Sequence, residues 1–318
     1  RKPFTLLTDT LYNSASIGIA YATRDADSVS ALLRCSDMAM YAAKQRGRNQ
    51  YAVYGEDLAH KQSRQEYLRQ GLSRALAQNE LSIDYQTIVG VDGGVEGLEA
   101  LLRWQFEGDA VSPATFIPIA EKSGLIAELG NWVIERALSD LAGWSENNGF
   151  SGFLALNVSM QQIVSAHFAE NVDRALKKYG IEPQRLMLEV AETPLVDDLE
   201  RGMEMIDRLQ SLGVQIAIDD FGTGYASFQH LRQLPISFLK VDKSFLQGVP
   251  DDEEKCETVR TLLDLAHSFR QRVVVEGVES PEQAAWLAQF PAVLRQGFYY
   301  QRPQAPAQLF PSASAEVE

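Results

Sequence analysis

The strongest constraint on the fold is an alternation, beginning after residue 80, between short apolar runs and longer amphipathic segments. The apolar runs have the length and the β-branched composition of buried strands. A chain that repeats this pattern must bury each strand against its neighbours and cover it with helices. Eight such runs occur, at Ile83–Val89, Leu98–Trp104, Phe153–Val158, Leu186–Val190, Gln215–Asp219, Phe238–Val241, Val273–Val275 and Gln296–Tyr300.

The order of strands and helices predicts an α/β barrel. Alternating strands and helices favour a parallel sheet with crossover helices, and eight repeats over ~250 residues are typical of a TIM-like (β/α)8 barrel. The segment Gly90–Gly94, between the first two runs, is too short for a parallel crossover, so we expect an antiparallel first strand. We assign the barrel to residues 81–310, with predicted helices at Leu125–Trp144, Phe168–Tyr179, Leu199–Leu212, Val259–Phe269 and Gln283–Phe290.

The remaining segments are predicted to be a small α+β unit, a connecting helix and a frayed tail. Residues 1–57 contain a predicted strand at 14–20, a helix at 28–46 and a strand at 50–54. One helix and a few strands leave a face uncovered, and the chain starts at Arg1 in the middle of a pattern, so we expect a fragment of a longer protein. Residues 58–80 are polar and helix-prone, and the tail at 311–318 is rich in small residues.

Composition excludes several classes of function. A net charge of -14 argues against a nucleic-acid surface, which needs a basic footprint. The two cysteines, Cys35 and Cys256, form no Cys-x-x-Cys motif, so we expect a reducing, cytoplasmic compartment. None of the four histidines ends an apolar run, which disfavours a His-rich metal site. No apolar stretch approaches the ~18 residues of a transmembrane helix, so we expect no membrane segment in this fragment.

The run at 215–219 ends in two adjacent carboxylates, Asp219 and Asp220, followed by Gly222 and Gly224. An unpaired charge at the end of a buried strand is costly, so packing alone does not account for this pair. Asp-Asp before glycine is also common turn chemistry. Acidic residues recur at the ends of other strands, however, and this recurrence favours a cation site.

Five carboxylates are expected to converge, because barrel enzymes place their chemistry at the carboxyl ends of the strands. At ~4 Å, two like charges repel by about 4 kcal/mol at an effective dielectric of ~20, so such a group favours bound cations. Oxygen ligands without Cys or His suit Mg²⁺ or Mn²⁺, and two metals sharing Asp219 would suit phosphoryl displacement. Lys240 and Arg103 would add positive charge. The converging oxygen ligands are Glu99, Glu189, Asp219, Asp220, Glu276 and the amide of Asn157.

Each of these residues also has a structural interpretation. Glu189 or Glu276 alone could be an ion-paired barrel residue, and Asn157 could begin a turn. Asp242 is more readily explained as structural than as catalytic. Two glutamates follow predicted ligands by three residues and are interpreted as loop anchors, namely Glu192 and Glu279.

The segment Asp37–Asn49 resembles the C-terminal helix of a GGDEF, or diguanylate cyclase, domain. In that family the positions of Lys44 and Arg48 contact nucleotide phosphates. The Gly-Gly-Asp-Glu-Phe hairpin and the metal-binding aspartate are absent from this sequence, so residues 1–57 are expected to be a structural remnant without cyclase activity.

The segment Glu99–Trp104 resembles the signature of the EAL domain, the family of cyclic di-GMP phosphodiesterases. The resemblance runs from about Leu68 to Pro303. Departures from the usual family pattern include Ala191, Thr87 and Lys243, and none removes a presumed ligand. Further matching motifs are Tyr85-Gln86, Phe116–Glu121, Asn157–Ser159, Asp219–Gly224, Leu239–Asp242, Glu276–Glu279 and Gln296-Gly297.

The resemblance implies a role for each site residue. Glu99, Lys240, Glu276 and Gln296 would be catalytic, with Lys240 orienting the attacking water. Substrate would be held by Gln86, Leu101, Arg103 and Asp242. Two Mg²⁺ or Mn²⁺ ions would be bound, the first by Glu99, Asn157, Glu189 and Asp219 and the second by Asp219 and Asp220, with Glu276 in support. Glu192 would fix the loop after Asp220.

The resemblance also implies the activity, which is metal-dependent hydrolysis of cyclic di-GMP to linear pGpG. The alternative is a catalytically silent cyclic di-GMP receptor that signals through loop or dimer movement. A homodimer formed through the barrel is expected in either case.

Overall fold

The computed structural model describes residues 4–6, 9–11, 14–22, 24–45, 47, 49–192, 195, 199–223 and 234–310. The chain divides into two compact units, residues 1–72 and 73–318. None of the helices in the described ranges is long and apolar enough to cross a membrane.

The first unit is a small α+β structure. Strands β3 (Ile17–Ile19) and β4 (Tyr51–Val53) pair in parallel, and helix α1 (Val29–Gln45) connects them. Ala39, Ala43 and Ala52 form its small core. The predicted strand, helix and strand are confirmed; the hairpin of β1 (Phe4–Leu6) and β2 (Asp9–Leu11) was not predicted. Helix α2 (Glu56–Ala75) follows, as expected for the connecting segment.

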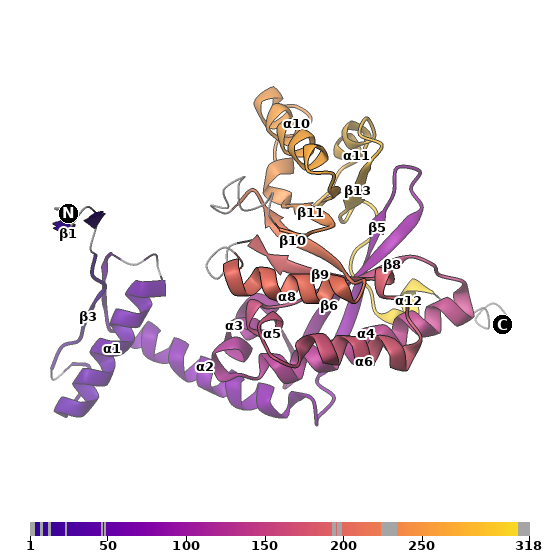
Figure 1. Cartoon of the computed structure of the whole chain (residues 1–318). Coiled ribbons are helices and arrows are strands. Elements are labelled where there is room, and N and C mark those ends of the chain that lie inside the picture. Colours follow the sequence, from indigo (N-terminus) through magenta and orange to yellow (C-terminus); the bar gives the residue numbers. More distant parts are fainter. Residues whose placement is uncertain are drawn as a thin grey trace. The chain divides into compact units, whose positions relative to one another are not determined.

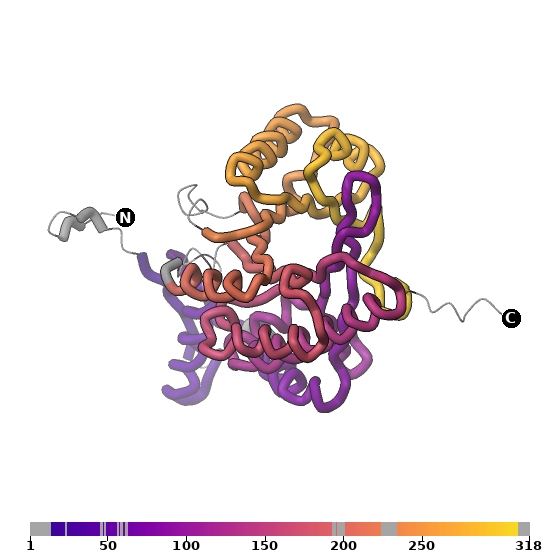
Figure 2. The backbone as a smooth tube through the Cα atoms, turned by 45° about the vertical axis from the view of Figure 1, so that its right-hand side comes forward, coloured from indigo at the N-terminus to yellow at the C-terminus, as the bar shows by residue number. Residues whose placement is uncertain are grey.

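The second unit contains a closed barrel of eight strands, counted among the described residues (Figure 1). The first strand, β5, pairs antiparallel with both β6 and β13 and so closes the ring, as Figure 2 shows where the β5–β6 hairpin lies beside the C-terminal segment. The other strand pairs of the ring are parallel. The prediction of a TIM-like barrel with an antiparallel first strand is confirmed. Its strands are β5 (Leu81–Val89), β6 (Val95–Phe106), β8 (Phe153–Asn157), β9 (Leu186–Ala191), β10 (Gln215–Phe221), β11 (Phe238–Val241), β12 (Arg272–Val275) and β13 (Val293–Gln296).

Helices cover the outside of the barrel, and the apolar faces between strands and helices form the main core. A second cluster, which includes Ile88, Met187 and Phe238, has side chains from the barrel strands alone. Strand β7 (Asp109–Val111), which extends β6 as a hairpin, was not predicted. The helices are α3 (Pro113–Ser123), α4 (Ile126–Asn148), α5 (Met160–Ile163), α6 (Phe168–Tyr179), α8 (Leu199–Ser211), α10 (Glu253–Ser268), α11 (Pro281–Leu287) and α12 (Pro306–Leu309), with 3-10 turns η1 (Pro183–Arg185) and η2 (Lys243–Leu246).

The prediction for the last strand is wrong in position. Strand β13 ends at Gln296, where the sequence predicted a strand to begin. Arg295 is buried within it, and this charged residue interrupts the apolar pattern that identified the other strands. The aromatic residues beyond the strand are largely exposed: Phe298 keeps 48% and Tyr299 45% of its surface. The predicted tail at 311–318 lies outside the described residues.

Candidate functional site

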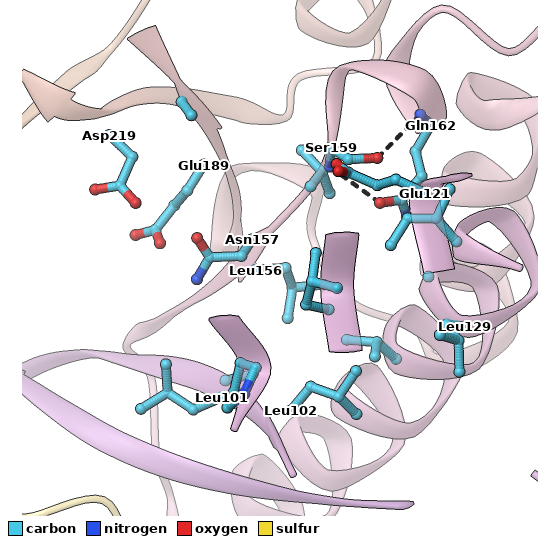
Figure 3. A pocket seen from close by; sticks show the side chains of 18 of the residues that line it. Leu101, Leu102, Glu121, Leu129, Leu156, Asn157, Ser159, Gln162, Glu189 and Asp219 are labelled. Atoms are coloured by element: carbon cyan, nitrogen blue, oxygen red, sulfur yellow. Dashed lines mark hydrogen bonds between the residues drawn. The ribbon is translucent and has the colours of Figure 1, made fainter. Parts of the chain in front are cut away.

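The predicted polar residues converge at the carboxyl ends of the barrel strands. Strand pairing places Asn157, the last residue of β8, opposite Glu189 on β9. Figure 3 shows Asp219, Glu189 and Asn157 in a row along one side of a cavity. Glu99 comes from β6 and Glu276 directly follows β12. Because β13 ends at Gln296, this residue reaches the same rim.

A buried lysine lies at the centre of these carboxylates. The ammonium nitrogen Nζ of Lys240 is 2.8 Å from Glu189 Oε2 and 2.6 Å from Glu276 Oε1. It also lies 3.6 Å from Glu99 Oε2 and 3.6 Å from Asp219 Oδ1. Lys240 has no solvent exposure. The sequence predicted its positive charge at the site, but not that one ammonium group would contact four carboxylates.

One ammonium group does not neutralise this site, and the pKa values show the imbalance. Burial alone would lower the pKa of Lys240, but the surrounding carboxylates, Glu189 and Glu276 foremost, raise it well above its usual value. Burial raises the pKa of Glu189 well above its usual value, and Lys240 offsets this only in part. Burial likewise raises the pKa of Glu276 to about 7. The ammonium group of Lys240 therefore stays charged, and the carboxyl groups around it outnumber the single positive charge.

Glu99 is held in its ionised form by hydrogen bonds. Asn157 Nδ2 donates to Glu99 Oε1 at 2.7 Å, and Gln296 Nε2 donates to Glu99 Oε2 at 2.5 Å. Burial alone would raise the pKa of Glu99, but Lys240 and these amides lower it. Gln296 Nε2 also reaches Gln86 Oε1 at 3.1 Å, and Gln86 Nε2 donates to the Gln301 carbonyl at 2.9 Å.

The donor set fits a hard divalent cation. Two buried acceptors, Glu189 Oε1 and Gln296 Oε1, have no hydrogen-bond partner, which is costly for buried polar atoms. The carboxylate and amide oxygens are those that Mg²⁺ and Mn²⁺ favour. Among the residues that the structure describes, no three His, Cys, Asp or Glu side chains are already grouped as metal ligands.

The end of β10 and the turn that follows it have an unusual backbone. Asp220 has a positive φ of 56°, and its N–H donates to Asp219 Oδ1 at 3.0 Å. Gly222 has a φ of 93°, and a Cβ there would lie 2.8 Å from the ring of Phe245. The N–H of Gly222 donates to Glu192 Oε2 at 3.0 Å, so buried Glu192 contacts this turn. Burial, with Asp219 next to it, raises the pKa of Asp220. Gly224 lies outside the described residues.

Three other predicted residues make their hydrogen bonds and ion pairs outside the group of carboxylates around Lys240. Asp242 caps η2 by accepting the N–H of Ser244 at 3.0 Å. Glu279 is exposed, and its own N–H donates to Gln283 Oε1 at 2.9 Å. Arg103 pairs with Asp84, with 2.8 Å between Arg103 Nε and Asp84 Oδ2. Sequence reasoning missed Asp84, although it stands two residues before Gln86 on β5 and so shares its face of the strand. Arg48 lies outside the described residues.

A cavity of about 580 Å³ adjoins the carboxylates. Asn157, Glu189, Asp219 and Asp220 line its polar end, and apolar side chains of β6, β8, α3 and α4 line most of the rest (Figure 3). Leu101 and Arg103 belong to its lining. Glu121, also in the lining, has its pKa raised by burial. A polar end beside an apolar wall suits a ligand that carries both charged groups and flat rings.

Comparison with known proteins identifies the family. The EAL domain profile matches residues 69–303, and the profile of the diguanylate cyclase GGDEF domain matches residues 1–50. The chain belongs to the EAL domain family, and its barrel is preceded by part of a GGDEF domain.

Relatives in Pseudomonas aeruginosa align over nearly the whole chain. The bifunctional diguanylate cyclase/cyclic di-GMP phosphodiesterase MucR is 33% identical over 315 residues, which cover 98% of this chain and 46% of the relative. The cyclic di-GMP phosphodiesterase NbdA is 33% identical over 305 residues, or 95% of this chain and 39% of the relative. The chain thus spans less than half of either protein.

A solved structure supports the fold assignment. The PaMucR phosphodiesterase in its c-di-GMP complex superposes with a TM-score of 0.73 at 34% identity. The match covers 77% of this chain and 100% of that chain. The barrel described above is therefore the EAL barrel.

Proposed function

We propose that this chain hydrolyses cyclic di-GMP to linear pGpG in the presence of Mg²⁺ or Mn²⁺. The observation that carries the proposal is the meeting of five carboxylates and an amide beside the cavity, with Glu189 Oε1 buried and unpartnered. The family and the names of the relatives supply the substrate. A homodimer through the barrel remains a prediction.

The proposed metal ligands are Glu99, Asn157, Glu189, Asp219 and Asp220. Bound divalent ions would activate water and offset phosphate charge, which is the usual contribution of paired metals to phosphoester hydrolysis. Lys240 keeps its ammonium charged among the ligands and holds Glu189 and Glu276 in place. Gln296 and Asn157 keep Glu99 ionised and oriented through their amide hydrogen bonds.

Glu276 is the proposed acceptor of the proton from the attacking water. Its pKa of about 7 lies close to neutral pH, where a general base is most effective. The water oxygen forms a bond to phosphorus, the bond from phosphorus to the 3′ oxygen breaks, and that oxygen takes up a proton from solvent water as it leaves. Arg103, in the lining of the cavity, is proposed to bind a phosphate of the dinucleotide.

Release of pGpG, measured by chromatography with Mg²⁺ or Mn²⁺, tests the proposal. Glu99→Gln should lower the rate by at least about a hundredfold, because it removes a charge at the centre of the site. Glu254→Gln on the exposed face of α10 is the matched control and should leave the rate unchanged. Tight binding of cyclic di-GMP by the parent without turnover under either metal would instead support a receptor.

A further inference from the structure

Building on the proposed function, we propose that Asp84 is a positioning residue for substrate binding. It holds the guanidinium of Arg103 on the wall formed by β5 and β6 and so keeps that group available to a substrate phosphate. Arg103 touches substrate in this proposal, whereas Asp84 acts through Arg103.

The contacts of Arg103 leave one nitrogen available. Its Nε donates to Asp84 Oδ2 at 2.8 Å, and its Nη1 donates to the Leu102 carbonyl at 3.2 Å. Nη2 makes no hydrogen bond to the part of the chain that the structure describes. A guanidinium fixed through two of its nitrogens is preorganised, so a phosphate that binds the third needs to order less of the side chain.

Strand pairing produces this contact. Asp84 on β5 lies opposite Leu101 on β6, and Arg103 lies opposite Ser82, so the two charged residues are diagonal neighbours across an antiparallel pair. The side chain of Arg103 keeps 30% and that of Asp84 29% of its exposure. The pair is thus partly exposed, and Arg103, which lines the cavity, is within reach of a ligand.

The charges around the cavity explain why Arg103 needs a partner of its own. Among the described lining residues Arg103 is the only cation, whereas Glu121, Glu189, Asp219 and Asp220 are acids. A free arginine would be drawn to these carboxylates and would occupy oxygens proposed to bind metal. Asp84, which is outside that lining, forms an ion pair with Arg103 and so holds it away from these carboxylates. A half-exposed ion pair adds little to stability, so a merely structural pair would leave substrate affinity unchanged.

The experiment compares Asp84→Ala and Asp84→Asn with the parent and with Arg103→Ala. We measure KM and kcat for cyclic di-GMP, and we measure its Kd by calorimetry in the Glu99→Gln background. Loss of positioning in Asp84→Ala should raise KM and Kd about three- to tenfold, because the side chain must then be ordered on binding, with kcat within about twofold. Asp84→Asn, which keeps an acceptor, should recover most of the affinity.

The matched control is Glu96→Ala, which removes an ion pair of similar length and greater exposure between Glu96 and Arg272. It should leave KM unchanged. In an Arg103→Ala protein, the additional change Asp84→Ala should have no further effect on KM or Kd.

An Asp84→Ala protein with unchanged or lower KM and Kd overturns the inference. The inference is also overturned if Asp84→Ala raises KM and Kd as much in the Arg103→Ala protein as in the parent. If the parent binds cyclic di-GMP without hydrolysing it, the proposed function fails, while the Kd values still decide the role of Asp84. If the parent does not bind it, both proposals fail.

Discussion

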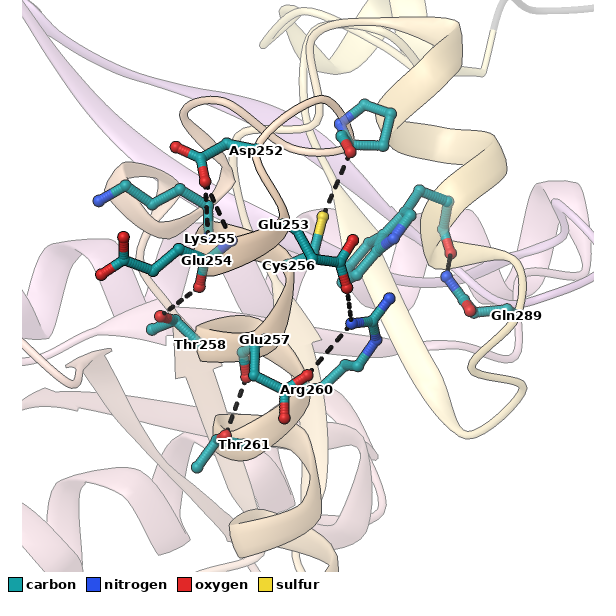
Figure 4. A network of polar contacts seen from close by, with 12 residues as sticks. Asp252, Glu253, Glu254, Lys255, Cys256, Glu257, Thr258, Arg260, Thr261 and Gln289 are labelled. Carbon is teal, nitrogen blue, oxygen red and sulfur yellow. Dashed lines mark hydrogen bonds and ion pairs between the residues drawn. The ribbon is translucent and has the colours of Figure 1, made fainter.

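Two clusters of charged residues in this chain have similar distances and different surroundings. At the barrel mouth, Lys240 Nζ lies 2.6 Å from Glu276 Oε1 and 2.8 Å from Glu189 Oε2. On helix α10, Arg260 Nη1 lies 2.7 Å from Glu253 Oε1 and 3.2 Å from Glu257 Oε2 (Figure 4). By distance alone, the two clusters would be equivalent.

Burial makes the clusters different. The side chains of Lys240 and Glu189 keep 1% and 0% of their exposure, whereas Glu253 and Glu257 keep 81% and 70%. Water solvates the α10 carboxylates whether or not they are paired, so their ion pairs stabilise little. The barrel carboxylates have lost that solvation, and each change in their charge balance is costly. The comparison teaches that desolvation, rather than contact distance, marks the functional cluster.

The largest expected effect comes from Lys240→Met. This change leaves several buried carboxylates without a cation, and it should lower the free energy of unfolding of the metal-free protein by about 3–5 kcal/mol. Urea unfolding measures the loss. Saturating Mn²⁺ should narrow the gap between variant and parent, because bound cations replace the lost charge. If metal-free Lys240→Met were as stable as the metal-free parent, burial would not distinguish the Lys240 cluster from the Arg260 cluster.

A pH titration of metal-free stability should give the next effect. The pKa of Glu276 in the folded protein, about 7, exceeds its ordinary value of 4.5, so the folded state binds the proton more tightly. This contribution is fully present below pH ~4.5 and is lost as the pH rises through ~7, for a total of up to about 3 kcal/mol. Glu189 acts in the same direction and Glu99 in the opposite one. Glu276→Gln should flatten the profile; an unchanged profile would contradict the assignment.

Glu192→Ala tests a buried carboxylate that accepts a hydrogen bond from the backbone N–H of Gly222. Its loss should lower the free energy of unfolding by about 1 kcal/mol, because the N–H of exposed Gly222 can turn to water. The loop that carries Asp219 and Asp220 should lose its position, so kcat should fall about ten- to a hundredfold. The exposed Glu279→Ala is the control and should change neither quantity. Equal effects in both variants would show that burial of Glu192 is irrelevant.

The smallest effect is expected for Arg260→Met. Its partners on α10 are exposed, and the remaining carboxylates of the first turn lie where the helix dipole favours negative charge. We expect no measurable change in thermal unfolding or in hydrolysis. A destabilisation as large as that of Lys240→Met would mean that contact distance, and not desolvation, governs these clusters.

The sequence was sufficient for the barrel fold and for most of its elements. Helix Phe168–Tyr179 and strand Phe238–Val241 have the predicted bounds, and in the helix the apolar residues recur at regular helical spacing. The last strand was misplaced because Arg295 is buried within it. An arginine breaks the run of apolar residues by which a buried strand is predicted, so the pattern predicted a strand only after it. Asp84 was missed because a single acid in a strand has no signature of its own.

The amino-acid sequence by itself determined the α/β barrel, its antiparallel first strand and the acidic strand ends, since all three follow from local patterns and from the length of one connection. Only the tertiary structure decided which charges meet. Gln296 and Glu99 are hydrogen-bonded across 197 residues of sequence, and Lys240 and Glu189 across 51. Closure of the barrel and the register of its strands bring these groups together, and neither is encoded in any single stretch of residues. Burial then fixes their protonation, because the cost of a charge depends on the solvent that the whole fold excludes.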